Sequence, residues 1–144
     1  MKCNGIWQGI LVTVLLSMMI SPALAQENGE TWSDALPEVM QQNGMTYTTG
    51  GFGLEERDAL KASAKDYNLI ISNAIQGGNF TEGETIIISG NNKTLTINDA
   101  GPLVYARLPS GTYLIKGING KETTERTLAI TDHEQARIHF IWSH

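Results

Sequence analysis

Cysteine is almost absent from this sequence. Its one cysteine, Cys3, stands ahead of an apolar stretch at residues 10–20. A lipid-modified cysteine would follow such a stretch, so Cys3 does not indicate a lipoprotein. Once the segment containing Cys3 is removed, as argued below, the chain has no thiol. The mature protein therefore cannot use disulfides and has no cysteine nucleophile.

The sequence also lacks a cluster of basic residues. Ten Lys and Arg residues are spread among fifteen Asp and Glu residues, and the formal net charge is -5. Nucleic acids and anionic membranes bind concentrated positive surface. Neither is expected as a partner, and the acidic balance is most simply explained by solubility.

No apolar run is long enough to cross a bilayer comfortably. The stretch at residues 10–20 is shorter than the ~20 residues that a spanning helix needs. Lys2 precedes it, and residues 23–25 read Ala-Leu-Ala, the small-x-small pattern that signal peptidase cleaves. These features predict a signal peptide over 1–25, export to the periplasm and no membrane span after cleavage. A membrane anchor is the alternative interpretation.

The next part of the chain contains one clear helix. Residues 26–45 are polar and predict a tail or a short helix. Residues 46–53 read as a β-prone stub and a glycine turn, whose spacing matches neither a dinucleotide fingerprint nor a P-loop. Over residues 54–66, acidic side chains come first and basic ones last, as the helix dipole favours. Leu60 and Ala64 lie on one apolar stripe of this predicted helix.

From residue 67 onward, apolar and polar residues alternate with the period of a strand. Turn signals rich in Gly, Asn, Asp and Pro separate the segments, and Asn119-Gly120 is a strong hairpin signal. Short strands without intervening helices predict a mainly β chain, with an antiparallel sandwich over residues 67–144 preceded by one short helix. The seven predicted strands are 67–75, 84–89, 94–98, 103–107, 112–118, 122–130 and 136–142.

One alternation gives each strand a core face. The residues predicted to point inward are Leu69, Ile71, Ile86, Ile88, Leu95, Ile97, Leu103, Tyr105, Tyr113, Ile115, Leu128, Ile130, Ile138, Phe140 and Trp142. Ile87, Val104, Leu114 and Ile141 then fall on the other faces, where solvated sheets carry polar residues. We therefore expect some element to cover part of one outer face, and the helix over 54–66 is the natural candidate.

The segment 101–113 carries a family resemblance. Its pattern, Gly-Pro-Leu-x-Tyr-x-x-Leu-Pro-x-Gly-x-Tyr, resembles the signature of carboxypeptidase regulatory-like domains, and the whole chain resembles small exported bacterial proteins that carry one. The resemblance covers about 67–142 and implies a seven-stranded antiparallel Ig-like or transthyretin-like β-sandwich. The chain departs from the pattern at Leu103, where an aromatic is common, and at Ser110, where proline is common.

The resemblance implies no activity, because function resides in sites rather than folds. Hydroxyisourate hydrolases share the transthyretin-like fold and end in a Tyr-Arg-Gly-Ser-like tail, whereas this chain ends in Ile-Trp-Ser-His at 141–144. The histidines left after cleavage are His133, His139 and His144. Ser110 lies in a Pro-Ser-Gly turn and not in a Gly-x-Ser-x-Gly elbow.

The sequence therefore predicts no catalytic, cofactor-binding or metal-binding residue and no cofactor. We expect a non-enzymatic periplasmic binding or accessory module whose partner is an unidentified envelope protein or ligand. One alternative is a subunit of an envelope assembly joined by strand addition at a sheet edge. The other is a hydrolase built on a sandwich scaffold. A convergent pocket of His, Arg and carboxylate would favour the enzyme, and a bare edge strand or exposed apolar patch would favour assembly.

The signal-peptide interpretation predicts cleavage between Ala25 and Gln26. The intact mass of the protein from a periplasmic fraction should correspond to a chain that begins at Gln26. A membrane-bound product that retains Lys2 would contradict it.

Overall fold

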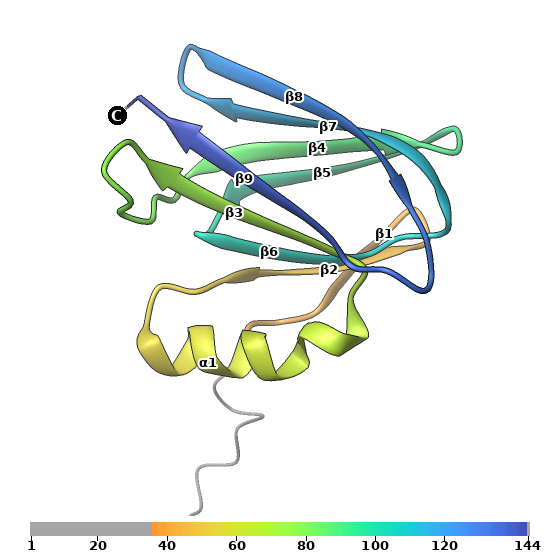
Figure 1. Ribbon diagram of the computed structural model, residues 1–144, viewed down its shortest axis with the longest axis horizontal. Helices are drawn as coiled ribbons and strands as arrows, with labels where there is room; N and C mark the ends of the chain where they lie inside the picture. Colours follow the sequence, from red (N-terminus) through yellow and green to blue (C-terminus); the bar gives the residue numbers. More distant parts are fainter. Residues whose placement is uncertain (1–35, 144) are drawn as a thin grey trace, which may run out of the picture.

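The computed structural model describes residues 36–143 as two β-sheets and a short helical segment (Figure 1). The first sheet has five strands, in the order β1 (Met40–Gln42), β2 (Met45–Gly50), β6 (Leu103–Arg107), β3 (Leu69–Ile75) and β9 (Ala136–Trp142). The second has four, in the order β5 (Lys93–Ala100), β4 (Glu84–Gly90), β7 (Gly111–Asn119) and β8 (Glu122–Ile130). Helix α1 (Leu54–Ser63) continues into the 3-10 turn η1 (Ala64–Asp66).

The predicted segments match seven of these strands, β3 to β9, and the predicted helix matches α1 and η1. The chain is mainly β with one short helix, as expected. Two further strands contradict the count of seven. β1 lies inside the range interpreted as a tail or short helix, and β2 occupies the stub at 46–53. The stub becomes a strand because it pairs with β6, more than fifty residues away in sequence.

The five-stranded sheet is also not fully antiparallel. β3 and β9 run in parallel, with Leu69 opposite Ala136 and Ile75 opposite Trp142. Between these strands the chain forms β6 and all four strands of the second sheet, and β9 then joins the first sheet in the same direction as β3. Parallel pairing needs such a long connection, so a prediction based on successive hairpins could not anticipate it.

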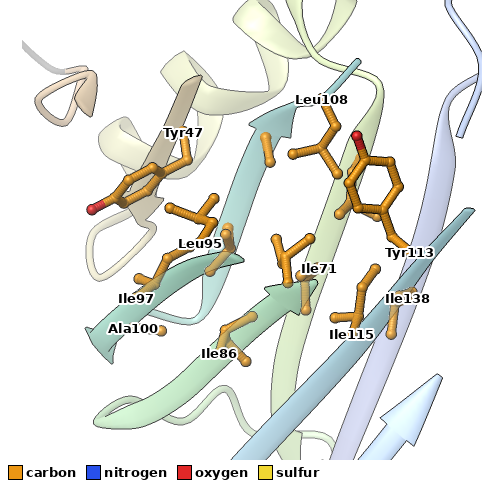
Figure 2. Close-up of a cluster of buried hydrophobic side chains, with 14 of the residues drawn as sticks. Tyr47, Ile71, Ile86, Leu95, Ile97, Ala100, Leu108, Tyr113, Ile115 and Ile138 are labelled. Carbon is orange, nitrogen blue, oxygen red and sulfur yellow. The ribbon is translucent and has the colours of Figure 1, made fainter. Parts of the chain in front are cut away.

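One large apolar core is shared by the two sheets, which gives a sandwich-like arrangement. Figure 2 shows side chains such as Ile71 from one sheet and Ile86 from the other directed into the same cluster. The buried members of this cluster are Met45, Tyr47, Leu69, Ile71, Ile86, Ile88, Leu95, Ile97, Ala100, Val104, Ala106, Leu108, Tyr113, Ile115, Ile130, Ile138, Phe140 and Trp142.

A second, smaller core confirms the expected role of the helix. Leu60 of α1 is completely buried, in one cluster with Ile70, Leu103 and Tyr105 on the outer face of β3 and β6. Figure 1 shows α1 lying against the five-stranded sheet, on the side away from the four-stranded sheet. The helix covers this face alone, since Leu114 and Ile141 remain 39% and 64% exposed.

Strand β6 corrects the predicted core faces. Leu103 and Tyr105 were expected to point into the main core, but they pack beneath α1, while Val104 and Ala106 take the main core positions. Every residue from Leu103 to Ala106 is buried. With both faces apolar, alternation cannot identify which face meets which partner.

The corner between β6 and β7 is held by side-chain hydrogen bonds. The Tyr113 hydroxyl donates to the Pro109 carbonyl at 2.6 Å. Asn91 Nδ2 donates to Tyr113 Oη at 3.0 Å and to the Ser110 carbonyl at 3.2 Å. A Cβ at Gly111 would lie 2.6 Å from Asn91 Oδ1, so the glycine of the motif is needed to let Asn91 approach.

The second core yields a stability prediction. Leu60→Ala should lower the free energy of unfolding by about 2–4 kcal/mol, because it removes a buried side chain whose neighbours cannot fully close the cavity. Leu54→Ala, on the same helix at a site 67% exposed, is the matched control and should change it by less than about 0.5 kcal/mol. Chemical denaturation followed by circular dichroism measures both. Equal effects of the two substitutions would mean that α1 does not pack on the sheet.

Candidate functional site

A polar pocket of about 270 Å³ lies where η1, the end of β6 and the β8–β9 loop meet. Side-chain hydrogen bonds build its walls. Gln135 Nε2 donates to the Ala64 and Tyr67 carbonyls at 2.7 and 3.0 Å, which satisfies the end of the helical segment. The lining residues are Ala64, Lys65, Tyr67, Asn68, Arg107, Asp132, His133, Glu134 and Gln135.

Asn68 is the buried lining residue that is held in place by hydrogen bonds on both sides of its amide group. Its side chain is buried, its Nδ2 donates to the Leu108 carbonyl at 2.8 Å, and its Oδ1 accepts from the Leu108 N–H at 2.9 Å. This two-way bond ties the start of β3 to the end of β6. Arg107, the residue before Leu108, donates from Nη1 to the Asp66 carbonyl at 3.3 Å. These hydrogen bonds join η1, β3, β6 and the β8–β9 loop around the pocket, and the charged side chains lie on its rim.

The pocket brings Arg107 beside a loop with three adjacent ionisable residues, a juxtaposition that the sequence did not predict. His133 and the carboxylates of Asp132 and Glu134 come from one exposed loop, and Arg107 comes from the end of β6. Among residues 36–143, no ion pair joins Arg107 or His133 to these carboxylates. Burial raises the pKa of Tyr67, and the charge of Asp66 raises it further, so this phenol stays protonated at neutral pH. The arrangement can bind polar groups, but it presents no activated nucleophile.

The histidines lie in separate places. His133 stands on the pocket rim, whereas His139 points outward from β9 and its Nδ1 lies 2.5 Å from the Ser72 hydroxyl. His144 is outside the described residues. Ser110 stays in the β6–β7 corner, where its carbonyl accepts from Asn91. Within residues 36–143, no three His, Cys, Asp or Glu side chains are grouped so that they could hold a metal ion.

A second depression, which we call the aromatic groove, has a volume of about 300 Å³. Phe52 and Phe80 are 60% and 46% exposed on it, and the Arg57 guanidinium carbon lies 5.4 Å from the centre of the Phe80 ring. Among the described residues, Arg57 makes no ion pair. The residues that line the aromatic groove are Gly51, Phe52, Arg57, Phe80, Thr81, Glu82 and Pro102.

Three elements position the aromatic groove. Phe52 lies in the turn between β2 and α1, where its N–H donates to Glu56 Oε2 at 2.8 Å. Arg57 extends from α1, and its Nε donates to the Gly53 carbonyl at 3.3 Å. The loop that carries Phe80 is pinned to the first sheet, since the Thr81 N–H donates to the Asn73 carbonyl at 3.2 Å. The sequence predicted only turns for the β2–α1 and β3–β4 connections. The signal that could have indicated a site was a single phenylalanine in each of these glycine-rich segments, Phe52 and Phe80.

A buried carboxyl group lies next to this loop. Glu84, at the start of β4, is fully buried and faces the interior. No hydrogen bond of ordinary geometry reaches its oxygens from the described residues. Burial raises the pKa of the Glu84 carboxyl, and the charge of Glu82 adds to this, while the Thr81 hydroxyl and the residue's own N–H oppose part of the shift. Burial therefore shifts the equilibrium of the Glu84 carboxyl toward its neutral form.

Comparisons with known proteins add little to this geometry. No family model matches the chain, and no curated protein matches it in sequence. Among solved structures, the Bacillus anthracis TIE protein is similar over 51% of this chain at 16% identity, with a TM-score of 0.45. The similar region is only 15% of that protein's length, and a likeness this weak carries no argument. Within residues 36–143, neither helical element has the length and apolar character to cross a membrane.

Glu84 gives a pH prediction with a definite sign. Folding takes up a proton at pH values between the ordinary carboxyl pKa of 4.5 and the raised one. The stability that Glu84 contributes is therefore complete below pH 4.5 and is lost as the pH rises through the raised pKa. Glu84→Gln should remove this loss, so the variant should be more stable than the parent at neutral pH. Denaturation midpoints measured across the pH range test it.

Glu82→Gln is the control, because Glu82 is exposed two residues before Glu84. It should leave most of the pH dependence in place. A parent whose stability rises steadily above pH 4.5, with Glu84→Gln following the same curve, would contradict a raised pKa for the Glu84 carboxyl.

Proposed function

We propose that this chain is a non-enzymatic periplasmic binding or accessory module, built on a carboxypeptidase regulatory-like, transthyretin-like β-sandwich, that takes a protein partner at the aromatic groove. The sequence motif at 101–113 and the two sheets sharing one core support the sandwich. The apolar stretch and the Ala-Leu-Ala sequence at 23–25 support export. The aromatic groove supports the binding role.

The observation that carries the proposal is the cation–π contact between Arg57 and Phe80, on an otherwise open surface. Arginine and aromatic residues are enriched among the side chains that dominate interface energies. Here the arginine is held over a ring and keeps guanidinium N–H groups that no carboxylate of the described chain takes up. Phe52 adds a second exposed ring beside them. A partner with an apolar side chain next to a carboxylate matches this surface.

The polar pocket favours a second candidate, a sandwich-scaffold hydrolase with His133 and Arg107 in its site. General base catalysis requires a histidine aligned on a nucleophile, and a third group usually orients the histidine. The side chain of His133 has neither relation among the described residues, and burial raises the pKa of Tyr67, which carries the hydroxyl group in the lining. We therefore place function at the aromatic groove and structural support at the polar pocket.

Paired substitutions separate the two candidates. Phe80→Ser should abolish complementation of a deletion strain, because it removes the ring on which Arg57 rests, while His133→Ala should complement fully. His133 is exposed, so its substitution should change the free energy of unfolding by less than about 0.5 kcal/mol. Phe80→Ser also removes the contact with Arg57 and should lower it by about 1 kcal/mol. Denaturation checks that both variants stay folded. The reverse pattern, loss with His133→Ala and retention with Phe80→Ser, would establish the enzyme candidate instead.

Photo-cross-linking locates the contact directly. A benzophenone amino acid in place of Phe80 should yield a discrete adduct in the periplasm, and one in place of Leu114 should not, although Leu114 is also an exposed apolar residue. Arg57→Ala should reduce the adduct at position 80 by roughly tenfold, as expected for an interface residue worth more than 1 kcal/mol. Equal adducts at both positions would show non-specific contact and contradict the assignment to the groove.

A further inference from the structure

The two sheets end in four outer strands, and three of them are protected against pairing with another chain. β1 has only three residues. On β5, the Thr96 N–H donates to Gln42 Oε1 at 2.8 Å and the Thr94 carbonyl accepts from Asn43 Nδ2 at 2.6 Å. On β8, the Glu125 carbonyl accepts from Arg126 Nη1 at 2.8 Å. Short length, side chains bonded to the edge and charged residues are the devices that prevent edge pairing.

Strand β9 has no such protection along its middle. The Ala136 N–H and the Trp142 carbonyl both bond toward β3, at 2.9 and 2.8 Å. Because backbone groups alternate in direction along a strand, the N–H and carbonyl groups of Arg137, His139 and Ile141 point to the open edge. No side chain of the described residues is seen to bond to the main chain between 137 and 141.

The open stretch has a defined end. The Ser143 N–H, the next group directed to the edge, donates to Glu122 Oε2 at 3.0 Å, and the Ser143 hydroxyl lies 3.3 Å from Glu122 Oε1. The Glu122 carboxylate therefore occupies the edge-facing backbone N–H of Ser143. Arg137 lies at the other end of the open stretch. Arg137 Nη2 donates to Gln135 Oε1 at 2.8 Å, its charge acts on Tyr105, and no carboxylate among residues 36–143 forms an ion pair with it. The edge thus carries a negative group at one end and a positive group at the other.

We propose that a second copy of this chain occupies this edge, with the two β9 strands paired antiparallel about His139. This register places each Arg137 opposite Ile141 of the partner subunit and His139 opposite His139 of the partner subunit. Each Arg137 then lies diagonal to Ser143 of the partner subunit and within reach of Glu122 of the partner subunit, and the twofold axis makes this charge pair twice.

The two faces of the joined sheet fit the same register. On the core face, Ile138 lies opposite Phe140 of the partner subunit, so apolar residues continue across the junction. On the outer face, Ile141 is 64% exposed in the single chain and becomes covered by the aliphatic part of the partner subunit's Arg137. The proposal is independent of the aromatic groove, because no lining residue of the groove belongs to β9.

Backbone-directed variants test the pairing in the full mature chain. Sedimentation velocity over a dilution series should show a reversible monomer–dimer equilibrium. His139→Pro removes an edge-facing N–H and no hydrogen bond of the β3–β9 ladder, and proline is tolerated at such positions. It should weaken dimerisation by roughly tenfold or more, since both copies lose a donor. His139→Ala is the matched control: it also loses the Ser72 contact but keeps the N–H, and it should remain a dimer.

Charge exchange provides a test that does not depend on proline. Arg137→Glu and Glu122→Arg should each weaken the dimer, because each places like charges opposite one another across the interface. The double variant should restore the dimer, because position 137 of one copy and position 122 of the other again carry opposite charges. A parent chain that stays monomeric at millimolar concentration would overturn the proposal. A dimer that His139→Pro and both charge variants leave unchanged would also overturn it, because the contact would then lie on another surface.

Discussion

The packing of Leu60 against the outer face of β3 and β6 is the interaction on which the rest of the structure depends. A strand that is apolar on both faces is unstable in a sheet with one face open to water, and β6 is such a strand. α1 removes this conflict by covering Leu103 and Tyr105. Without the helix, the central strand of the five-stranded sheet would expose a large apolar surface at its centre.

The same contact positions both candidate sites. Arg57 lies on α1 three residues before Leu60, and Phe52 lies in the turn that leads into the helix, so docking of Leu60 sets one wall of the aromatic groove. At the other end, η1 and Tyr67 form a wall of the polar pocket, and Gln135 caps them. The helix is therefore both a cover for the core and the element that places the exposed side chains.

Most of the fold could be predicted because it is determined locally. Alternation and turn residues such as Asn119-Gly120 identified β3 to β9, and dipole-matched charges identified α1. Sequence could not assign the faces of β6, since burial from two sides erases the alternation. It also did not predict that the β-prone stub pairs with β6 or that β3 and β9 run in parallel, because both pairings join segments distant in the chain. The aromatic groove was missed for the same reason: Phe52, Arg57 and Phe80 meet only after the loops are placed by the sheets.

Native-state hydrogen exchange tests the central claim most directly. If α1 is an integral part of the core, the amide of Leu60 should exchange with the same free energy of opening as the amides of β6, close to that of global unfolding. That result would show that helix and sheet open as one unit. An opening free energy for Leu60 several kcal/mol below that of β6 would contradict the account, because the sheet would then keep its structure while the helix is detached.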